Sequence, residues 1–497
     1  MLSHREQVKD IRTEAPPAND GASLRAEERT SNPGPAEWPP AAGLKRPADA
    51  DAAGPPPCGG DGRVAGAGRE WAGACAHSFG FSSQIIPSLA GLVVGQRRVV
   101  LCRCRDLTVG TDSWVNGADK RRSQRSRGNI MQKLVQQAID QLVESGAELG
   151  IQVAVYQHGE LVVDAVAGVA DPDSGRPVAS DIPFYSASTG KGVTATVVHV
   201  LADRGALDYD TPIVELWPEF GAHGKNKATI RHALTHSIGV PAVPSDLTVQ
   251  DLADWDRMCT LIADSEPWWE PGTKTGYHAM TWGFVMGEIV RRATGKPISQ
   301  VLRQEVAAPL GIADELFFGV PESELGRLAR LEEAPGTAAM MAAVPADMPM
   351  LKATPPAVTP SAKYGNSPVV LTSDIPSGGT MSARAAAKMY AALLGEVDGV
   401  RLVSDERLRA VTALATADVD QMVGFPIPRA LGYNLGRPGA DPQETLSAFG
   451  MPGMGGSAAY ADTATGISFA LTKNRFFPGP SAAVNQVSEL VAEVATS

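Results

Sequence analysis

The sequence predicts a fold that mixes helices and strands (class α/β, α+β), with a sheet flanked by the first and last helices of the folded region. Near the start of that region, apolar residues recur at helical spacing over residues 134–143. Alternating apolar residues then predict a β-hairpin over residues 151–166. At the other end of the chain, a strand predicted over residues 467–471 precedes an apolar helix over residues 482–495.

Composition excludes several classes of function. The chain has 497 residues, of which 43% are hydrophobic and 20% are charged, as in a soluble globular protein. Its net charge of -11 argues against nucleic acid as a partner, because a nucleic-acid binder needs a basic face. Of its five cysteines, only Cys259 lies in the region predicted to fold, which fits a reducing compartment and predicts a cytoplasmic location. Cys102-x-Cys104 lacks a second pair at zinc-finger spacing, so we expect no metal there.

Residues 1–128 differ from the rest of the chain. Their Pro- and Gly-rich runs have no apolar period and cannot bury enough surface to offset chain entropy. We therefore expect a disordered extension, or a start codon assigned too early, before a folded domain over residues 129–497. The most apolar piece, residues 85–94, is too short to span a bilayer and too far from the N-terminus for a signal peptide.

Residues 184–192 contain a Ser188-x-x-Lys191 pattern at the start of a helix predicted over residues 192–202. Residues three apart on a helix share a face, with Cβ atoms about 5–6 Å apart. A serine hydroxyl becomes nucleophilic when a nearby base takes its proton, and a lysine kept neutral by its surroundings can be that base. The helix start adds N–H groups and a positive dipole end that favour developing negative charge. The pattern alone is common by chance, so the hypothesis of a catalytic serine depends on further motifs.

A second motif, in residues 229–239, predicts a short helix that ends at Gly239. His232 and His236 have a spacing that in principle suits a metal, but the glutamate of the zinc-protease pattern is missing. We favour a packing or capping role for both histidines, and expect neither a metal nor a cofactor in this chain.

The third motif surrounds Tyr277, which follows a Pro-Gly turn and precedes a helix predicted over residues 280–294. Functional side chains are often presented at such a loop, although an aromatic residue also serves to fill one. Residues 333–372, rich in Ala, Pro and Met, predict a long loop or flap that walls a substrate groove. Further helices are predicted over residues 382–394 and 404–416.

The last motif is the Gly-rich segment 449–457 (Phe-Gly-Met-Pro-Gly-Met-Gly-Gly-Ser), which lies beside predicted strands. Glycines next to a strand let another backbone or a ligand approach closely. An edge strand at this position can offer a backbone N–H to an acyl oxygen.

In combination, these motifs resemble the serine β-lactamase and penicillin-binding-protein superfamily, closest to its class C-like branch with the family VIII carboxylesterases. The resemblance covers the chain from about residue 131 to its end. It implies a mostly antiparallel sheet with helices on both faces, a helical subdomain within residues 195–370, and a site between the two. Its supports are Ser188-Thr-Gly-Lys191, residues 229–236, Trp269-Glu-Pro-Gly272, Gly276-Tyr277-His278-Ala279 and residues 449–457.

The resemblance also implies roles for individual residues. Ser188 would be acylated, Lys191 would take its proton, and Tyr277 would pass a proton to the leaving group. The backbone N–H groups of Ser188 and Met454 would form the oxyanion hole, where each donor is worth about 3–4 kcal/mol. Gly453 would belong to the same substrate-binding strand.

Two positions depart from the family pattern. Ala279 replaces the Asn of the Tyr-x-Asn motif, which removes an amide that contacts the acyl group and argues against a lactamase. Met451-Pro452-Gly453 replaces Lys-Thr-Gly. Because Met451 neither carries charge nor donates a hydrogen bond, it argues against recognition of a substrate carboxylate at that position.

The resulting hypothesis is a serine hydrolase that forms an acyl-enzyme on Ser188, most simply a carboxylesterase acting on a small ester or amide. No Gly-x-Ser-x-Gly elbow occurs, so an α/β-hydrolase is unsupported. A transacylase that passes the acyl group to an amine or alcohol would carry the same motifs, and a β-lactamase or peptidase is a further alternative. Met451 favours a catalytically silent binding protein, whereas the intact Ser188, Lys191 and Tyr277 oppose it. The sequence does not indicate the oligomeric state.

Overall fold

The computed structural model describes residues 117–345 and 347–496, which lie in one compact unit. Helix α1 (Gly117–Glu144) begins before the apolar period of the sequence, so residues 117–128 belong to this helix. The rest of the predicted extension, its apolar piece 85–94 and Cys102-x-Cys104 lie outside the described residues.

A seven-stranded sheet forms the centre of this unit, in the order β3-β2-β1-β11-β10-β9-β8, and all of its paired neighbours are antiparallel. The predicted hairpin is β1 and β2. β11 pairs with β1, so that Val153 lies opposite Leu471 and strands from near the two ends of the described region meet in the middle of the sheet. The strands are β1 (Gly150–Gln157), β2 (Glu160–Asp171), β3 (Arg176–Pro177), β8 (Asn434–Leu435), β9 (Ala448–Pro452), β10 (Ala458–Asp462) and β11 (Ile467–Lys473).

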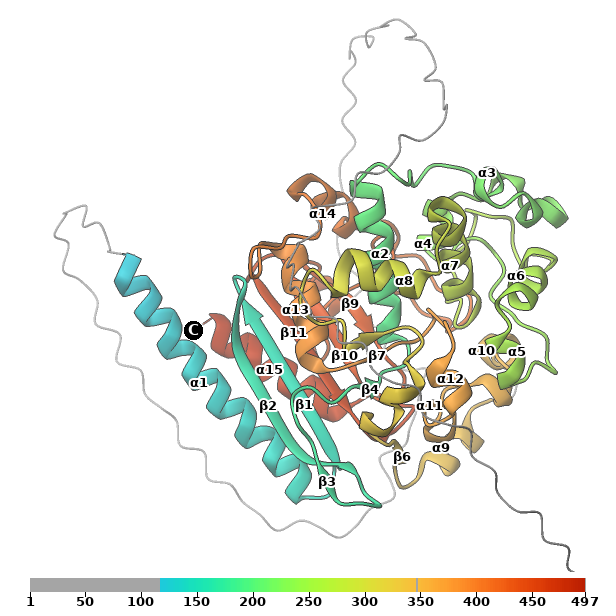
Figure 1. The fold of residues 1–497 in the computed structure, drawn as a ribbon. Helices are drawn as coiled ribbons and strands as arrows, with labels where there is room; N and C mark the ends of the chain where they lie inside the picture. Colours follow the sequence, from blue (N-terminus) through green and yellow to red (C-terminus); the bar gives the residue numbers. More distant parts are fainter. Residues whose placement is uncertain (1–116, 346, 497) are drawn as a thin grey trace, which may run out of the picture. The chain divides into compact units, whose positions relative to one another are not determined.

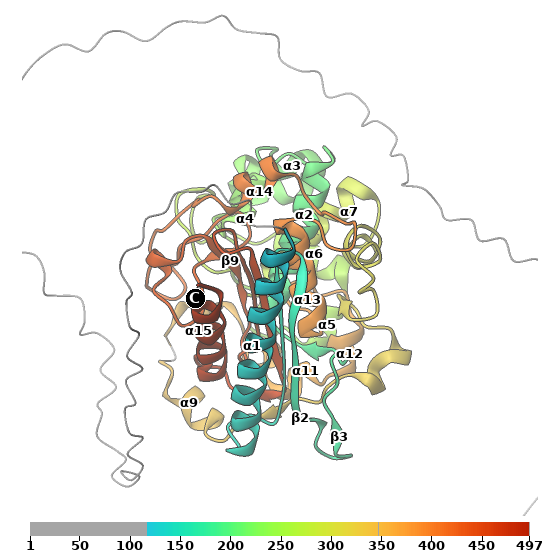
Figure 2. The same ribbon diagram turned by 90° about the vertical axis from the view of Figure 1, so that its left-hand side faces the viewer.

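Helices cover both faces of the sheet, as Figures 1 and 2 show. α1 and α15 (Ala482–Thr496) pack on one face against side chains such as Val153 and Phe469. α2 (Thr189–Asp203) and α13 (Ala383–Leu394) pack on the other. The period-2 alternation of β1 supplies both cores, because successive side chains point to opposite faces. The predicted fold class is therefore confirmed.

Between α2 and α13 the chain is mostly helical, in the region where a helical subdomain was expected (Figure 1). Residues 333–372 are not one long loop, because they contain several short helices. The helical elements are α3 (Ile213–Leu216), η1 (Pro218–Lys227), α4 (Ile230–Leu234), α5 (Val249–Ala253), α6 (Trp255–Ala263), α7 (Thr281–Thr294), α8 (Ile298–Leu302), η2 (Arg303–Ala307), η3 (Glu322–Arg327), α9 (Thr337–Ala343), α10 (Pro349–Ala353), η4 (Pro356–Val358), α11 (Ala362–Gly365) and α12 (Pro368–Thr372).

Short elements complete the unit. β4 and β5 pair with β7 on either side of it, and β12 pairs with β6. α14 (Asp405–Thr412) ends earlier than residue 416, where the sequence predicted its end. None of the helices in the described residues is long and apolar enough to cross a membrane. The remaining bounds are β4 (Phe184–Tyr185), β5 (Leu316–Phe317), β6 (Glu332–Glu333), β7 (Thr380–Met381), β12 (Arg475–Phe476) and η5 (Pro442–Glu444).

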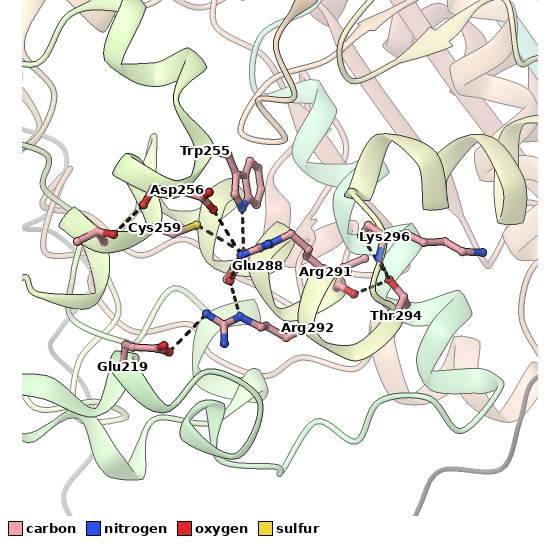
Figure 3. A network of polar contacts seen from close by, with 11 residues as sticks. Glu219, Trp255, Asp256, Cys259, Glu288, Arg291, Arg292, Thr294 and Lys296 are labelled. Carbon is pink, nitrogen blue, oxygen red and sulfur yellow. Dashed lines mark hydrogen bonds and ion pairs between the residues drawn. The ribbon is translucent and has the colours of Figure 1, made fainter.

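A buried carboxylate links two helices of the helical region (Figure 3). Glu288 of α7 is fully buried and forms ion pairs with Arg291 and Arg292. It also accepts hydrogen bonds from Trp255 Nε1 of α6 (2.8 Å) and from the Cys259 thiol (3.6 Å). Burial acts to raise the pKa of Glu288, but the hydrogen bonds from both arginines and Trp255 outweigh it and lower the pKa. Glu288 is therefore a charged group whose partners hold α6 against α7.

Candidate active site

Ser188 lies at a sharp turn between β4 and α2. Ala187 has a φ of 45°, in the left-handed region that residues with a Cβ seldom adopt. Ser188 then has helical angles and caps α2, which begins at Thr189. The backbone N–H of Ser186 donates to the Gly379 carbonyl (2.8 Å), which ties this turn to the segment before β7. The turn presents the Ser188 hydroxyl at the N-terminal end of a buried helix.

Lys191 lies in the first turn of α2 and is fully buried. Its Nζ is 3.1 Å from Ser188 Oγ and donates to the Ser377 carbonyl at 2.7 Å. Burial lowers the pKa of Lys191 to about 7. A large fraction of the amine is therefore neutral near pH 7 and can accept a proton.

Tyr277 comes from the loop before α7 and completes the cluster. Its hydroxyl donates to Ser188 Oγ at 2.7 Å, and the Lys191 Nζ lies 5.1 Å from the centre of its ring. Burial raises the pKa of Tyr277 to about 12, although the hydrogen bond with Ser188 acts in the opposite direction. At neutral pH the phenol therefore keeps its proton and is a donor. The three residues predicted as catalytic meet at one oxygen atom.

Two buried histidines pack beside Tyr277. The His236 ring lies 5.1 Å from the Tyr277 ring and stacks on Trp282 at 5.5 Å. The His278 backbone N–H donates to His236 Nδ1 (3.2 Å), and His278 Nε2 accepts from the Val240 N–H (3.0 Å). Burial lowers the pKa of His278 to about 4 and holds that of His236 well below its usual range. Both rings are neutral at pH 7 and act as packing and hydrogen-bonding groups.

A buried ion pair holds the loop that carries Tyr277. Arg429 Nη2 and Asp420 Oδ2 are 2.5 Å apart, and both side chains are almost completely buried. Arg429 Nη1 donates to Thr275 Oγ1 (3.0 Å), and the Gln421 backbone N–H donates to the Thr275 carbonyl (2.9 Å). The pair therefore joins the segment before β8 to the residue two positions before Tyr277.

The end of β9 lies directly against the turn that carries Ser188. A Cβ built on Gly453 would be 2.3 Å from the Ser186 carbonyl oxygen and 2.6 Å from Thr189 Oγ1, so only glycine fits there. Met451 is buried and packs toward α2, because its Cβ would lie 3.5 Å from a Cβ built on Gly192. The side chain of Met454 is partly exposed. The structure thus brings the Gly-rich segment beside Ser188, with Met451 in a packing position.

An apolar wall stands beside Tyr277. Trp269, Ala353 and Met422 are buried in one cluster, against which Met350 and Tyr277 pack. Met350 and Ala353 belong to α10, in the segment expected to form a flap. That segment contributes to the wall through a short helix.

The structure gives the two histidines of residues 229–239 different roles. His232 caps α4, because its Nδ1 accepts from the Thr229 N–H (3.3 Å), whereas His236 packs on Tyr277. The prediction that this helix reaches Gly239 is wrong, since α4 ends at Leu234 and His236 adopts a left-handed φ of 57°. In the part of the chain that the structure describes, no group of three potential metal ligands occurs.

Sequence reasoning missed several supporting residues. The Ser377 carbonyl, the left-handed Ala187 and the Asp420–Arg429 pair carry no motif that relates them to Ser188. Only the Gly378-Gly379 pair after Ser377 signals a close backbone approach, since a Cβ on Gly190 would lie 2.1 Å from the Gly378 backbone.

Comparisons with known proteins agree with this geometry. A family model for beta-lactamases matches residues 135–493. Esterase/beta-lactamase LipL of Mycobacterium tuberculosis is 35% identical over 339 residues, which is 66% of this chain and 77% of LipL. Esterase EstB of Burkholderia gladioli is 31% identical, over 35% of this chain and 48% of EstB.

Solved structures give the same result. The crystal structure of a family VIII carboxylesterase matches with a TM-score of 0.66 and 30% identity, over 73% of this chain and 97% of that one. A penicillin-binding protein homolog from Caulobacter crescentus matches with a TM-score of 0.65 and 30% identity, over 73% of this chain and 97% of the homolog. The chain therefore belongs to the β-lactamase family, as a serine hydrolase of that fold.

Proposed function

We propose that this protein is a carboxylesterase that hydrolyses small esters through an acyl-enzyme on Ser188. The observation that carries the proposal is the convergence of Lys191 Nζ and Tyr277 Oη on Ser188 Oγ, at 3.1 and 2.7 Å. LipL and EstB, which are at least 30% identical to this chain, are both described as esterases. Ala279 and the buried Met451 remove polar groups that the resemblance associates with lactamases, which favours an ester over a β-lactam.

In acylation, neutral Lys191 takes the proton of Ser188 Oγ as that oxygen attacks the ester carbonyl. The negative charge that develops on the carbonyl oxygen is stabilised by the backbone N–H groups of Ser188 and Met454, at the positive end of α2. Tyr277, which keeps its proton at neutral pH, protonates the departing alkoxide. The proton taken by Lys191 then restores the Tyr277 hydroxyl.

In deacylation, water enters from the position that the alcohol has left and attacks the acyl carbon. The same groups act in reverse, so Ser188 recovers its proton and the carboxylic acid leaves. The substrate is a small molecule, and neither nucleic acid nor a metal takes part. A cytoplasmic location is proposed on the cysteine usage, since Cys259 is a free buried thiol.

A transacylase is the second candidate, in which an amine or alcohol replaces water. Monacolin J acid methylbutanoyltransferase of Aspergillus terreus is 27% identical to this chain over 165 residues, 28% of this chain and 39% of the transferase. The wall of Trp269, Met350 and Met422 favours this alternative, because an apolar surface beside Tyr277 suits an organic acceptor better than water.

Turnover of p-nitrophenyl butyrate tests the proposal. We expect the wild-type chain to release nitrophenolate steadily and Ser188→Ala to lose more than about 1,000-fold in kcat. Ser323→Ala, at an exposed serine, is the matched control and should retain full activity. Turnover by Ser188→Ala with an unchanged melting temperature would exclude Ser188 as the nucleophile. Faster nitrophenolate release on addition of an alcohol or amine would favour the transacylase.

A further inference from the structure

A cavity borders the Gly-rich strand β9 without including the Ser188 cluster. It has a volume of about 420 Å³, and Ser188, Lys191 and Tyr277 are not among the residues that line it. Its walls are β8, β9 and β10, the loops before and after β8, and the start of α15. The side chains of Tyr460 and Val484 belong to the core between the sheet and α15. The cavity therefore lies on the α15 side of the sheet, opposite α2.

The lining of this cavity is mostly apolar, with polar side chains at Asn434, Arg437, Ser457, Tyr460, Ser481 and Asn485. Arg437 is the one charged residue in the lining, and no acidic residue is present in it. Apolar side chains form most of the wall, among them Phe425, Pro426, Pro438, Pro442 and Val484. Phe425 is 53% exposed, which is unusual for a large aromatic side chain and leaves an apolar rim at the cavity. Such a lining suits an apolar body that carries one negative charge.

Two residues of the cavity lining each have a buried polar atom without a partner among the described residues. Arg437 Nη1 and Asn434 Oδ1 are both buried from solvent without a hydrogen bond. Among the described residues, no carboxylate lies within ion-pair distance of Arg437. A buried guanidinium N–H that lacks an acceptor is costly, so a rotation of the Arg437 or Asn434 side chain into the cavity, where a ligand supplies the missing partner, would relieve that cost. The Asn434 amide can serve as acceptor or, after rotation, as donor.

We propose that this cavity binds a small carboxylate with an apolar body, with its carboxylate on Arg437 and Asn434. A guanidinium matches a planar carboxylate through two parallel hydrogen bonds. The chain as a whole carries a charge of -11 and does not attract anions, so the local charge of Arg437 provides the selectivity. The hydrocarbon part of the ligand replaces water along the proline, phenylalanine and valine wall.

The two sites share a strand but do not depend on each other. Residues 451–453 line the cavity, and Gly453 also contacts the turn that carries Ser188. The carboxylate site rests only on the cavity and its unpartnered atoms, so it stands whether or not Ser188 is acylated.

Isothermal titration of the full-length Ser188→Ala variant with 4-phenylbutyrate tests this inference without turnover. We expect saturable binding of 4-phenylbutyrate, and at least about tenfold weaker binding of the neutral 4-phenylbutanamide. Arg437→Gln in the same background should weaken 4-phenylbutyrate binding by about tenfold or more and leave that of the amide unchanged. Arg303→Gln, at an exposed arginine, is the matched control and should bind like the parent.

Two further measurements separate the cavity from the Ser188 cluster. Val484→Phe, which fills the cavity, should abolish binding of both compounds, and circular dichroism checks that it folds. A crystal structure of the complex should place the carboxylate on Arg437. Absence of binding, equal affinity in Arg437→Gln, or a ligand found only beside Ser188 would each overturn the inference.

Discussion

At the scale of single residues, burial is what would allow Lys191 to act as the base in the proposed mechanism. Its amine lies in a closed environment with the Ser377 carbonyl and Ser188 Oγ as partners and with no carboxylate on Nζ. Without an acidic partner, nothing offsets the loss of hydration, and the pKa falls to about 7. Tyr277 experiences the same burial, which raises the pKa of its phenol to about 12. One environment therefore leaves a largely neutral amine and a protonated phenol beside one hydroxyl.

The first prediction concerns pH. Because Lys191 must be neutral to take the proton of Ser188, kcat/KM for an ester should fall about tenfold per pH unit below about pH 7 and level off above it. A pH–rate profile with p-nitrophenyl butyrate measures this fall in kcat/KM at low pH. Lys191→Met should lose this pH dependence together with most of the activity. A wild-type profile that stays flat between pH 5 and pH 8 would contradict the role of Lys191.

The motifs predicted the three residues that meet at Ser188 Oγ, but not the groups that support them. Ser188 and Lys191 were predictable because they are three apart on a helix, and Tyr277 because the resemblance implied it. The acceptor at Ser377 and the ring of His236 were not, since contacts over long sequence separations leave no local pattern. Ala187 has a left-handed φ without being glycine, so its sharp turn has no signal in the sequence.

At the scale of elements, the position of β9 against α2 determines where the proposed oxyanion donors, the N–H groups of Ser188 and Met454, lie relative to each other. Gly453→Ala would place a methyl group 2.3 Å from the Ser186 carbonyl and move the strand away. We expect kcat/KM to fall by about tenfold to a hundredfold, and the melting temperature to fall as well because the clash is with backbone. Gly326→Ala is the control, because a Cβ on Gly326 meets no atom within 4 Å. Full activity of Gly453→Ala would show that the strand does not position the reacting groups.

The packing of α6 against α7 in the helical region depends on Glu288. Replacing it by glutamine leaves Arg291 and Arg292 without their buried partner, and should lower the free energy of unfolding by about 2–3 kcal/mol at pH 7. Because the folded-state pKa of Glu288 is lowered, its contribution is present above the unfolded-state pKa and is lost as pH falls through the folded value.

Urea unfolding of Glu288→Gln measures this difference. The gap between wild type and variant should begin to shrink below about pH 4, where the carboxylate of the unfolded chain becomes protonated, and close as pH falls through the lower pKa of the folded state. Glu322→Gln, at an exposed glutamate, should unfold like the wild type. Equal midpoints for Glu288→Gln and wild type at pH 7 would show that the ion pairs contribute nothing.

Whether a helix or strand exists was easier to predict than the residues at which it begins and ends. The helices over residues 280–294 and 382–394 agree with α7 and α13 to within a residue, because long apolar periods continue to the caps. Residues 333–372 appeared as a loop because their helices are too short to show an apolar period.

At the scale of the whole molecule, strands from near both ends of the described region form the centre of the sheet. β1 and β11 pair in the centre, and α1 packs against α15. The local pattern predicted the hairpin and the terminal helices, and economy predicted that these helices flank one sheet. The pairing of β1 with β11 was not predicted. The helical region then lies between α2 and α13 and supplies Tyr277 to a serine that the sheet side holds.

Intact-mass spectrometry after mixing with p-nitrophenyl butyrate, with nitrophenolate release followed in parallel, tests the central claim most directly. The account predicts a transient mass increase of one butyryl group that maps to Ser188, with continued release of nitrophenolate. No adduct with any ester or β-lactam would contradict the acyl-enzyme and identify a binding protein that keeps the fold.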